Sequence, residues 1–144
     1  MAENKKKVAV ALSGGVDSAA TAYILKKQGY NVIGITMKLF DDFNCLDVKK
    51  IACSLKIDYT VVDLRDYFKL NVINTFIKEY REGKTPNPCI ICNKKIKYGK
   101  LLKIVKKLGI DKLALGHYAR IIYNENDKKY HLYKGLASNK DQSY

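Results

Sequence analysis

Tryptophan is absent from this sequence of 144 residues, and proline and histidine each occur only twice. Long apolar runs are also missing. No stretch approaches the roughly 20 residues that a membrane-spanning helix requires, so we expect no membrane partner. The N-terminus leads from a lysine cluster into only a short apolar run, which is not typical of a signal peptide. We therefore expect a cytoplasmic protein.

Acidic residues are scarce: 14 Asp and Glu accompany 27 Lys and Arg, giving a net charge of +13. This balance favours a polyanionic partner such as nucleic acid, the alternative being that the lysines only solvate the surface. Structural disulfides are not expected in a cytoplasmic chain, although this one has four cysteines. Three roles remain open for the cysteines: redox or sulfur chemistry, a metal site, or ordinary buried thiols. The four residues are Cys45, Cys53, Cys89 and Cys92.

The segment Ser13–Ser18, called the phosphate loop below, reads Ser-Gly-Gly-Val-Asp-Ser. It joins an apolar run typical of a buried strand, Val8–Leu12, to a predicted helix, Ala19–Gln28. Its glycines permit a tight turn, Ser18 can cap the helix, and the helix N-terminus offers N–H groups to a phosphate. A generic strand-to-helix turn is the alternative. The Lys-Ser or Lys-Thr ending of a Walker A loop is missing, whereas SGGxDS resembles the loop of the ATP pyrophosphatases.

Strand and helix patterns alternate along the rest of the chain. This alternation predicts an α/β fold, a doubly wound parallel sheet with helices on both faces, in one domain over residues 1–144. A short β-hairpin is expected near the C-terminus. The predicted strands are Val32–Met37, Asp58–Asp63, Lys112–Leu115 and the hairpin pair Arg120–Tyr123 and Lys129–Tyr133, and the predicted helices are Leu46–Leu55, Asp66–Glu82 and Asn93–Leu108.

The stretch Gly83–Asn93 contains both prolines and two cysteines, and we expect a stiff, extended loop. Cys92 would then lie at a helix N-terminus beside lysines, a position that favours a thiolate. Three interpretations of the Cys89–Cys92 pair remain open. It can be half of a metal or iron–sulfur site completed by Cys45, Cys53 or a partner chain, a redox or sulfur-transfer pair, or two unreactive thiols.

A helix rich in lysine follows, and then a strand that ends in Gly116-His117-Tyr118-Ala119. Ligands bind at the carboxyl ends of strands in open α/β sheets, so this segment and Met37 are expected near a ligand. Gly116 allows a close approach. His117 is a candidate base contact or general acid, with a structural histidine as the alternative.

Five motifs occur here in the order and spacing of the tRNA-specific 2-thiouridylases, and the chain resembles the N-terminal portion of that family. They are SGGVDS, Met37, TPNPxxxCN (Thr85–Asn93), GHYA and KDQSY (Lys140–Tyr144). The resemblance implies an adenine nucleotide alpha hydrolase-like fold of the PP-loop ATPase type. It also implies that ATP adenylates the C2 carbonyl oxygen of the wobble uridine, after which a persulfide sulfur displaces AMP to give 2-thiouridine.

The resemblance further implies the residue roles. Mg²⁺ accompanies the ATP, a sulfur-donor protein is a partner, and a disulfide bond belongs to the sulfur chemistry. Cys92 is the nucleophile, and Asn87, Pro88 and Cys89 meet the target base. The tRNA contacts are His117, Lys140, Asp141 and Gln142. The ATP contacts are Ala11, Leu12, Ser13, Gly14, Gly15, Val16, Asp17, Ser18, Met37 and Gly116.

Two departures from the family pattern affect these expectations. Many members have Asp where this chain has Cys89, which leaves a second sulfur carrier or a cluster ligand open for that residue. Members also continue well beyond Tyr144, and Ser138 or Asn139 can open a further helix, so we expect a truncated domain that does not thiolate tRNA unaided. The rival interpretations are a metal-binding or redox module that contacts RNA, and an inactive remnant of a split gene.

Overall fold

The computed structural model describes residues 6–110, 112–137 and 139–143, and its centre is a parallel sheet of four strands in the order β3-β2-β1-β4. The register pairs Val10 of β1 with Gly34 of β2 and with Ala114 of β4. The bounds of the strands are β1 Lys7–Ala11, β2 Asn31–Lys38, β3 Asp58–Asp63 and β4 Lys112–Ala114. Because β1 and β2 are central, they carry the apolar runs that the sequence shows.

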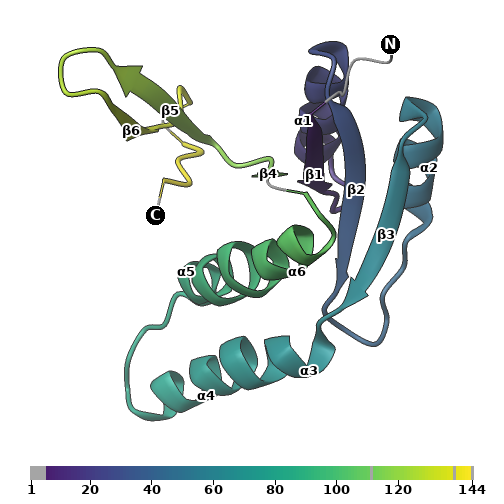
Figure 1. Ribbon diagram of the computed structural model, residues 1–144. Coiled ribbons are helices and arrows are strands. Elements are labelled where there is room, and N and C mark those ends of the chain that lie inside the picture. The colour runs from purple at the N-terminus through teal and green to yellow at the C-terminus, as the bar shows by residue number, and fades with distance from the viewer. Residues whose placement is uncertain (1–5, 111, 138, 144) are drawn as a thin grey trace.

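Each face of the sheet packs against different helices (Figure 1). Side chains alternate along a strand, so Val8 and Val10 contact one helix layer while Ala9 lies on the other side. The first layer is formed by α1, Val16–Lys27, and α2, Leu46–Leu55. The second is formed by the helices that precede β4. The predicted doubly wound α/β fold is confirmed.

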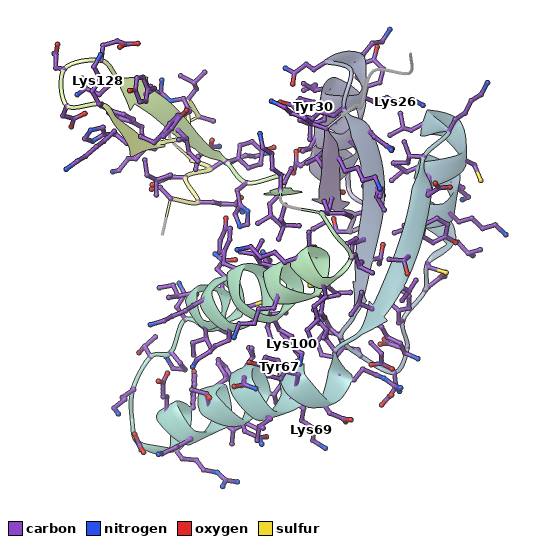
Figure 2. All side chains as sticks on the ribbon, in the orientation of Figure 1. Lys26, Tyr30, Tyr67, Lys69, Lys100 and Lys128 are labelled. Atoms are coloured by element: carbon purple, nitrogen blue, oxygen red, sulfur yellow. The ribbon has the colours of Figure 1, made fainter. Side chains whose placement is uncertain are left out.

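The connection from β3 to β4 consists of two long helical segments that pack on one another (Figure 1). The first runs through α3, η1 and α4, and the second through α5, η2 and α6, with η1 and η2 in π-helical geometry. Figure 2 shows Lys100 and Tyr67 where the segments meet, with the ammonium 5.2 Å from the ring centroid. The bounds are α3 Arg65–Phe68, η1 Lys69–Ile73, α4 Asn74–Arg81, α5 Pro88–Cys92, η2 Asn93–Leu101 and α6 Leu102–Lys107.

A two-stranded antiparallel hairpin, β5 Ala119–Asn124 and β6 Lys129–Lys134, stands apart from the parallel sheet (Figure 1). Directly paired residues share a face, so Ile121 with Leu132 and Tyr123 with Tyr130 form one apolar face. Those four side chains are all exposed. The predicted hairpin is confirmed, with each strand one residue longer at one or both ends.

Some predicted boundaries are wrong. The stretch expected to be extended up to Asn93 becomes helical at Pro88, since Asn87 caps α5 by accepting a hydrogen bond from the Cys89 N–H at 3.0 Å. The first helix begins at Val16 rather than at residue 19, and its N-cap is Gly15 and not Ser18. Asn139 opens no helix within the described residues, while Ser138 and Tyr144 lie outside them.

Candidate functional site

A cavity of about 400 Å³ opens at the carboxyl ends of β1, β2 and β4. It brings together residues that are far apart in the sequence, including most of the predicted ATP contacts and two of the predicted tRNA contacts. Those predicted residues are Ala11, Leu12, Ser13, Gly15, Asp17, Ser18, Met37, Gly116, His117 and Gln142. Gly14 and Val16 are not part of the lining.

The phosphate loop is held by its own side chains. The Ser18 hydroxyl donates to the Gly15 carbonyl at 2.9 Å and accepts from the Ser13 N–H at 3.2 Å. Gly14 has φ +86°, a conformation that favours glycine. No side chain caps α1 at Gly15, so the first N–H groups of this helix have no partner within the helix and remain available to an anion.

The segment after β4 packs closely against the phosphate loop. A Cβ atom at Gly116 would come within 2.9 Å of the Asp17 carbonyl carbon and 3.0 Å of the Ser18 nitrogen. Only glycine allows this approach without a shift of the backbone. Two residues later, the Tyr118 hydroxyl donates to Asp17 Oδ1 at 2.7 Å.

Two polar atoms at the cavity are buried and unsatisfied. Among the described residues, Thr36 Oγ1 and His117 Nδ1 are the buried side-chain nitrogen or oxygen atoms that lack a hydrogen-bond partner. Thr36 is only 3% exposed, and both residues line the cavity. Because an unsatisfied buried polar group is costly, both atoms indicate that a polar ligand belongs here.

Positive charge also reaches the cavity. Lys97 of η2 lines it. Burial, followed by the charge of Lys97, lowers the pKa of His117, so this imidazole is neutral and can accept or donate a single proton.

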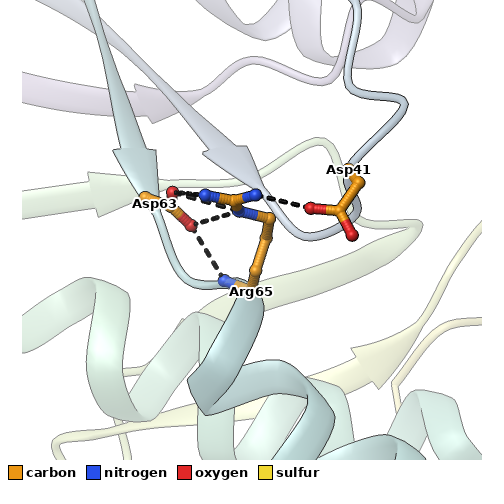
Figure 3. A network of polar contacts seen from close by, with 3 residues as sticks. All are labelled: Asp41, Asp63 and Arg65. Carbon is orange, nitrogen blue, oxygen red and sulfur yellow. Dashed lines mark hydrogen bonds and ion pairs between the residues drawn. The ribbon is translucent and has the colours of Figure 1, made fainter.

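The wall beyond β2 is fixed by an ion-pair network (Figure 3). The loop 39–44 supplies Leu39, Phe40 and other lining residues. Arg65 joins Asp41 of this loop at 2.5 Å to Asp63 at the end of β3 at 2.7 Å. The hydrogen bonds from Arg65 lower the pKa of Asp63 to about 2. The network therefore holds the loop against the sheet at neutral pH.

The two cysteines of the Thr85–Asn93 motif do not line the cavity. Cys92 is half-buried between the helical segments, beside Leu64 and Val72. Burial raises the pKa of Cys92, and the charge of Lys97 lowers it by a smaller amount. The expected thiolate at a helix N-terminus is therefore wrong, because the helix begins one turn earlier and the thiol lies in its interior.

The other cysteine expectations also change. All four cysteines are free thiols, so the disulfide implied by the resemblance is not formed in this structure. Cys89 is exposed. Within the described part of the chain, no three His, Cys, Asp or Glu residues gather to hold a metal, so neither Cys45 nor Cys53 completes a site with the Cys89–Cys92 pair.

The predicted RNA residues lie partly at the cavity and partly beside it. The Lys140 ammonium is 5.1 Å from the centroid of the Tyr118 ring. The Asp141 carboxylate accepts hydrogen bonds from the backbone and hydroxyl of Ser143, each at 3.1 Å. Gln142 lines the cavity. Asn87 and Pro88 form the start of α5, outside the lining.

Several lining residues were not predicted as site residues. Thr36 is a hydroxyl residue within an otherwise apolar strand, a signal that the sequence contains. Lys97 is one of many lysines on its helix, and the sequence does not single it out. The remaining ones are Leu39, Phe40, Asp42, Phe43, Asn44, Val48 and Leu115. No local pattern distinguishes these, apart from their place in or near loops that follow strands.

Comparison with solved structures supports the fold. A chain described as a predicted subunit of tRNA methyltransferase from Methanocaldococcus jannaschii superposes with a TM-score of 0.60 at 24% identity. The match covers 94% of this chain and 60% of that one.

Curated relatives carry the name indicated by the motifs. A tRNA-specific 2-thiouridylase MnmA of Clostridioides difficile is 45% identical over 96% of this chain and 42% of the relative. The same-named protein of Syntrophomonas wolfei is 49% identical over 96% of this chain and 41% of the relative. The resemblance to the 2-thiouridylases is confirmed, and the chain spans less than half the length of these relatives. The family model described as tRNA methyl transferase HUP domain matches residues 6–144, and the chain therefore belongs to that family.

Proposed function

We propose that this chain is the ATP-binding catalytic domain of a tRNA 2-thiouridylase. The C2 carbonyl oxygen of the wobble uridine attacks the α-phosphorus of ATP, and pyrophosphate leaves. The terminal sulfur of a persulfide on a carrier cysteine then attacks C2, and AMP departs with the former carbonyl oxygen. The Cys92 thiolate attacks the carrier's own sulfur, so that the S–S bond of the adduct breaks and 2-thiouridine is released. A disulfide between Cys92 and the carrier cysteine remains and is reduced by an external thiol. The observation that carries the proposal is the cavity in which the phosphate loop meets two unsatisfied buried polar atoms.

The nucleotide roles are supported by the lining of this cavity. The N-terminus of α1 and the phosphate loop suit the pyrophosphate part of ATP, with Mg²⁺ bound to it as part of the substrate. Thr36 and Met37 lie near the carboxyl end of β2. Beside them the loop 39–44 contributes the apolar lining residues Leu39, Phe40 and Phe43, which suit a purine ring. A cavity of about 400 Å³ is within the usual range for a small-molecule site.

The RNA role is supported by charge. The net charge is +13, and the helix that bears Cys92 continues into a run of exposed lysines. Those lysines are Lys94, Lys95, Lys100, Lys103, Lys106 and Lys107. A phosphate backbone laid along this helix would bring a flexible nucleotide toward both the cavity and the motif of residues 85–93.

Cys92 acts in this proposal as the nucleophile, and the uracil is contacted by Asn87, Pro88 and Cys89. Burial raises the pKa of Cys92, so its thiol stays protonated until substrate binding changes its surroundings. Lys97 is the cation that reaches both Cys92 and the cavity, and it favours the thiolate. His117, Lys140, Asp141 and Gln142 contact the tRNA, and a separate sulfur-donor protein supplies the persulfide sulfur.

The proposal is tested by calorimetric titration of the chain with Mg·ATP, followed by pyrophosphate release in the presence and absence of a tRNA transcript. We expect ATP binding that is lost in Gly15→Val and Asp17→Ala, and pyrophosphate release that requires tRNA. The matched control for Asp17→Ala is Asp58→Ala, since Asp58 is exposed at the start of β3 and does not line the cavity. Unchanged ATP affinity in both loop variants would refute the nucleotide assignment.

A further inference from the structure

Tyr118 connects two parts of the site that the sequence separates widely. Its hydroxyl donates to Asp17 Oδ1 of the phosphate loop at 2.7 Å. Asp17 lies in the first turn of α1, where the unpaired N–H groups of the helix are found. A hydrogen bond to a carboxylate is charge-assisted and orients that carboxylate, so Tyr118 controls where the negative charge of the loop lies.

The backbone of Tyr118 is fixed by the C-terminal segment. The Tyr118 N–H donates to Gln142 Oε1 at 3.1 Å, and the Gln142 N–H donates to the Tyr118 carbonyl at 3.0 Å. The Lys140 ammonium lies 5.1 Å from the ring centroid, within the range of a cation–π contact. Tyr118 therefore contacts Lys140 and Gln142 with its backbone and ring, and the phosphate loop with its hydroxyl.

Close packing leaves little room for this residue to move independently. On one side, a Cβ at Gly116 would already be 2.9 Å from the Asp17 backbone. On the other side, a Cβ at Gly135 would be 3.0 Å from the Tyr118 carbonyl oxygen. Since two hydrogen bonds join Gln142 to the Tyr118 backbone, a displacement of residues 140–142 acts on Tyr118, and through it on the hydrogen bond to Asp17.

We propose that Tyr118 is a positioning residue that couples occupancy of the Lys140–Gln142 segment by RNA phosphate to the affinity of the phosphate loop for nucleotide. RNA bound to Lys140 orders the segment, which holds the Tyr118 hydroxyl on Asp17 and fixes the loop for the triphosphate. This inference rests on the proposed function, because it assigns the Lys140–Gln142 segment to RNA and the phosphate loop to ATP. Coupling between two ligands is reciprocal, so ATP must tighten RNA binding by the same factor.

The test is the ATP affinity of the 144-residue chain measured by calorimetry with and without a saturating tRNA transcript. In the unsubstituted chain we expect tRNA to tighten ATP binding about fivefold, the low end for coupled sites because the Tyr118–Asp17 pair is exposed. We call the ATP affinity with tRNA divided by the ATP affinity without tRNA the coupling ratio. Tyr118→Phe keeps the ring and the Gln142 contacts, so we expect its tRNA affinity in the absence of ATP to be unchanged. Its coupling ratio should fall to about one.

Tyr130→Phe is the matched control, because Tyr130 is 75% exposed on the hairpin and its loss of a hydroxyl should leave the ratio at its original value. A thermal unfolding curve for each variant confirms that it is folded. The coupling is overturned if the unsubstituted chain binds both ligands with no change in ATP affinity, or if Tyr118→Phe keeps the full ratio. Absence of ATP binding by the unsubstituted chain would instead overturn the proposed function and the coupling together.

Discussion

Replacing Thr36 by valine should stabilise the protein and weaken nucleotide binding at the same time. The Thr36 side chain is 3% exposed, and its hydroxyl has no partner in the described part of the structure. An unsatisfied buried polar group costs about 1–3 kcal/mol, and valine has nearly the same shape. We expect Thr36→Val to raise the free energy of unfolding by about 1 kcal/mol, measured by urea denaturation without ligand.

The same substitution removes the group that a nucleotide would satisfy. Loss of one neutral hydrogen bond, with the ligand atom left unpaired, should weaken ATP binding by about tenfold. Thr60→Val is the matched control, since Thr60 is exposed on the neighbouring strand and should change stability by less than about 0.5 kcal/mol. Loss of stability together with unchanged ATP affinity would show that Thr36 is a structural residue and that the argument from its orphaned hydroxyl is mistaken.

Three further perturbations test separate parts of the site. Gly116→Ala should destabilise the fold by roughly 1–3 kcal/mol and abolish ATP binding, because its Cβ meets the loop backbone at 2.9 Å; destabilisation with normal ATP affinity would contradict this. Lys97→Gln should raise the pKa of Cys92 further, so that alkylation of that thiol, followed by mass spectrometry, needs a higher pH than in the unsubstituted chain. Arg65→Ala should weaken ATP binding by freeing the loop 39–44. In the unsubstituted chain, stabilisation by Asp63 is complete above its ordinary pKa of 3.8 and is lost as the pH falls through about 2. In Arg65→Ala the folded-state pKa of Asp63 should return toward 3.8, so urea denaturation at several pH values should show that this acid-dependent loss of stability shrinks.

The strands themselves and the end of the sheet that holds the site follow from local patterns, whereas the strand order comes from the structure. Apolar runs identify β1 and β2, and glycines with a following helix identify the phosphate loop. The start of α5 also has a local signal, because Asn followed by Pro is a common N-cap and N1 pair. The extended loop predicted from the two prolines is therefore wrong from Pro88 onward. That error moved Cys92 from the helix interior to its N-terminus and reversed the direction of its pKa shift.

The π-helical segments have only a weak signal in the sequence. Ile96 and Leu101 are both fully buried and are five residues apart, a spacing that suits a wider turn than the α-helix provides. Gly99 fits there because a Cβ would be 2.8 Å from the Lys94 carbonyl oxygen. The hydrogen bond from Tyr118 to Asp17 had no trace at all, since its partners are 101 positions apart and only the folded sheet brings them together.

The exposed apolar face of the β5–β6 hairpin has a consequence for the solubility of the chain. This face consists of four exposed apolar or aromatic side chains, Ile121, Leu132, Tyr123 and Tyr130. It lies beside the edges of a two-stranded sheet, and exposed strand edges of this kind can pair with other chains and lead to ordered aggregation. A net charge of +13 opposes this by keeping molecules apart. Salt shortens the reach of that repulsion to about 10 Å at 0.1 M, so solubility should fall as ionic strength rises, and a bound polyanion that neutralises the charge should act in the same direction.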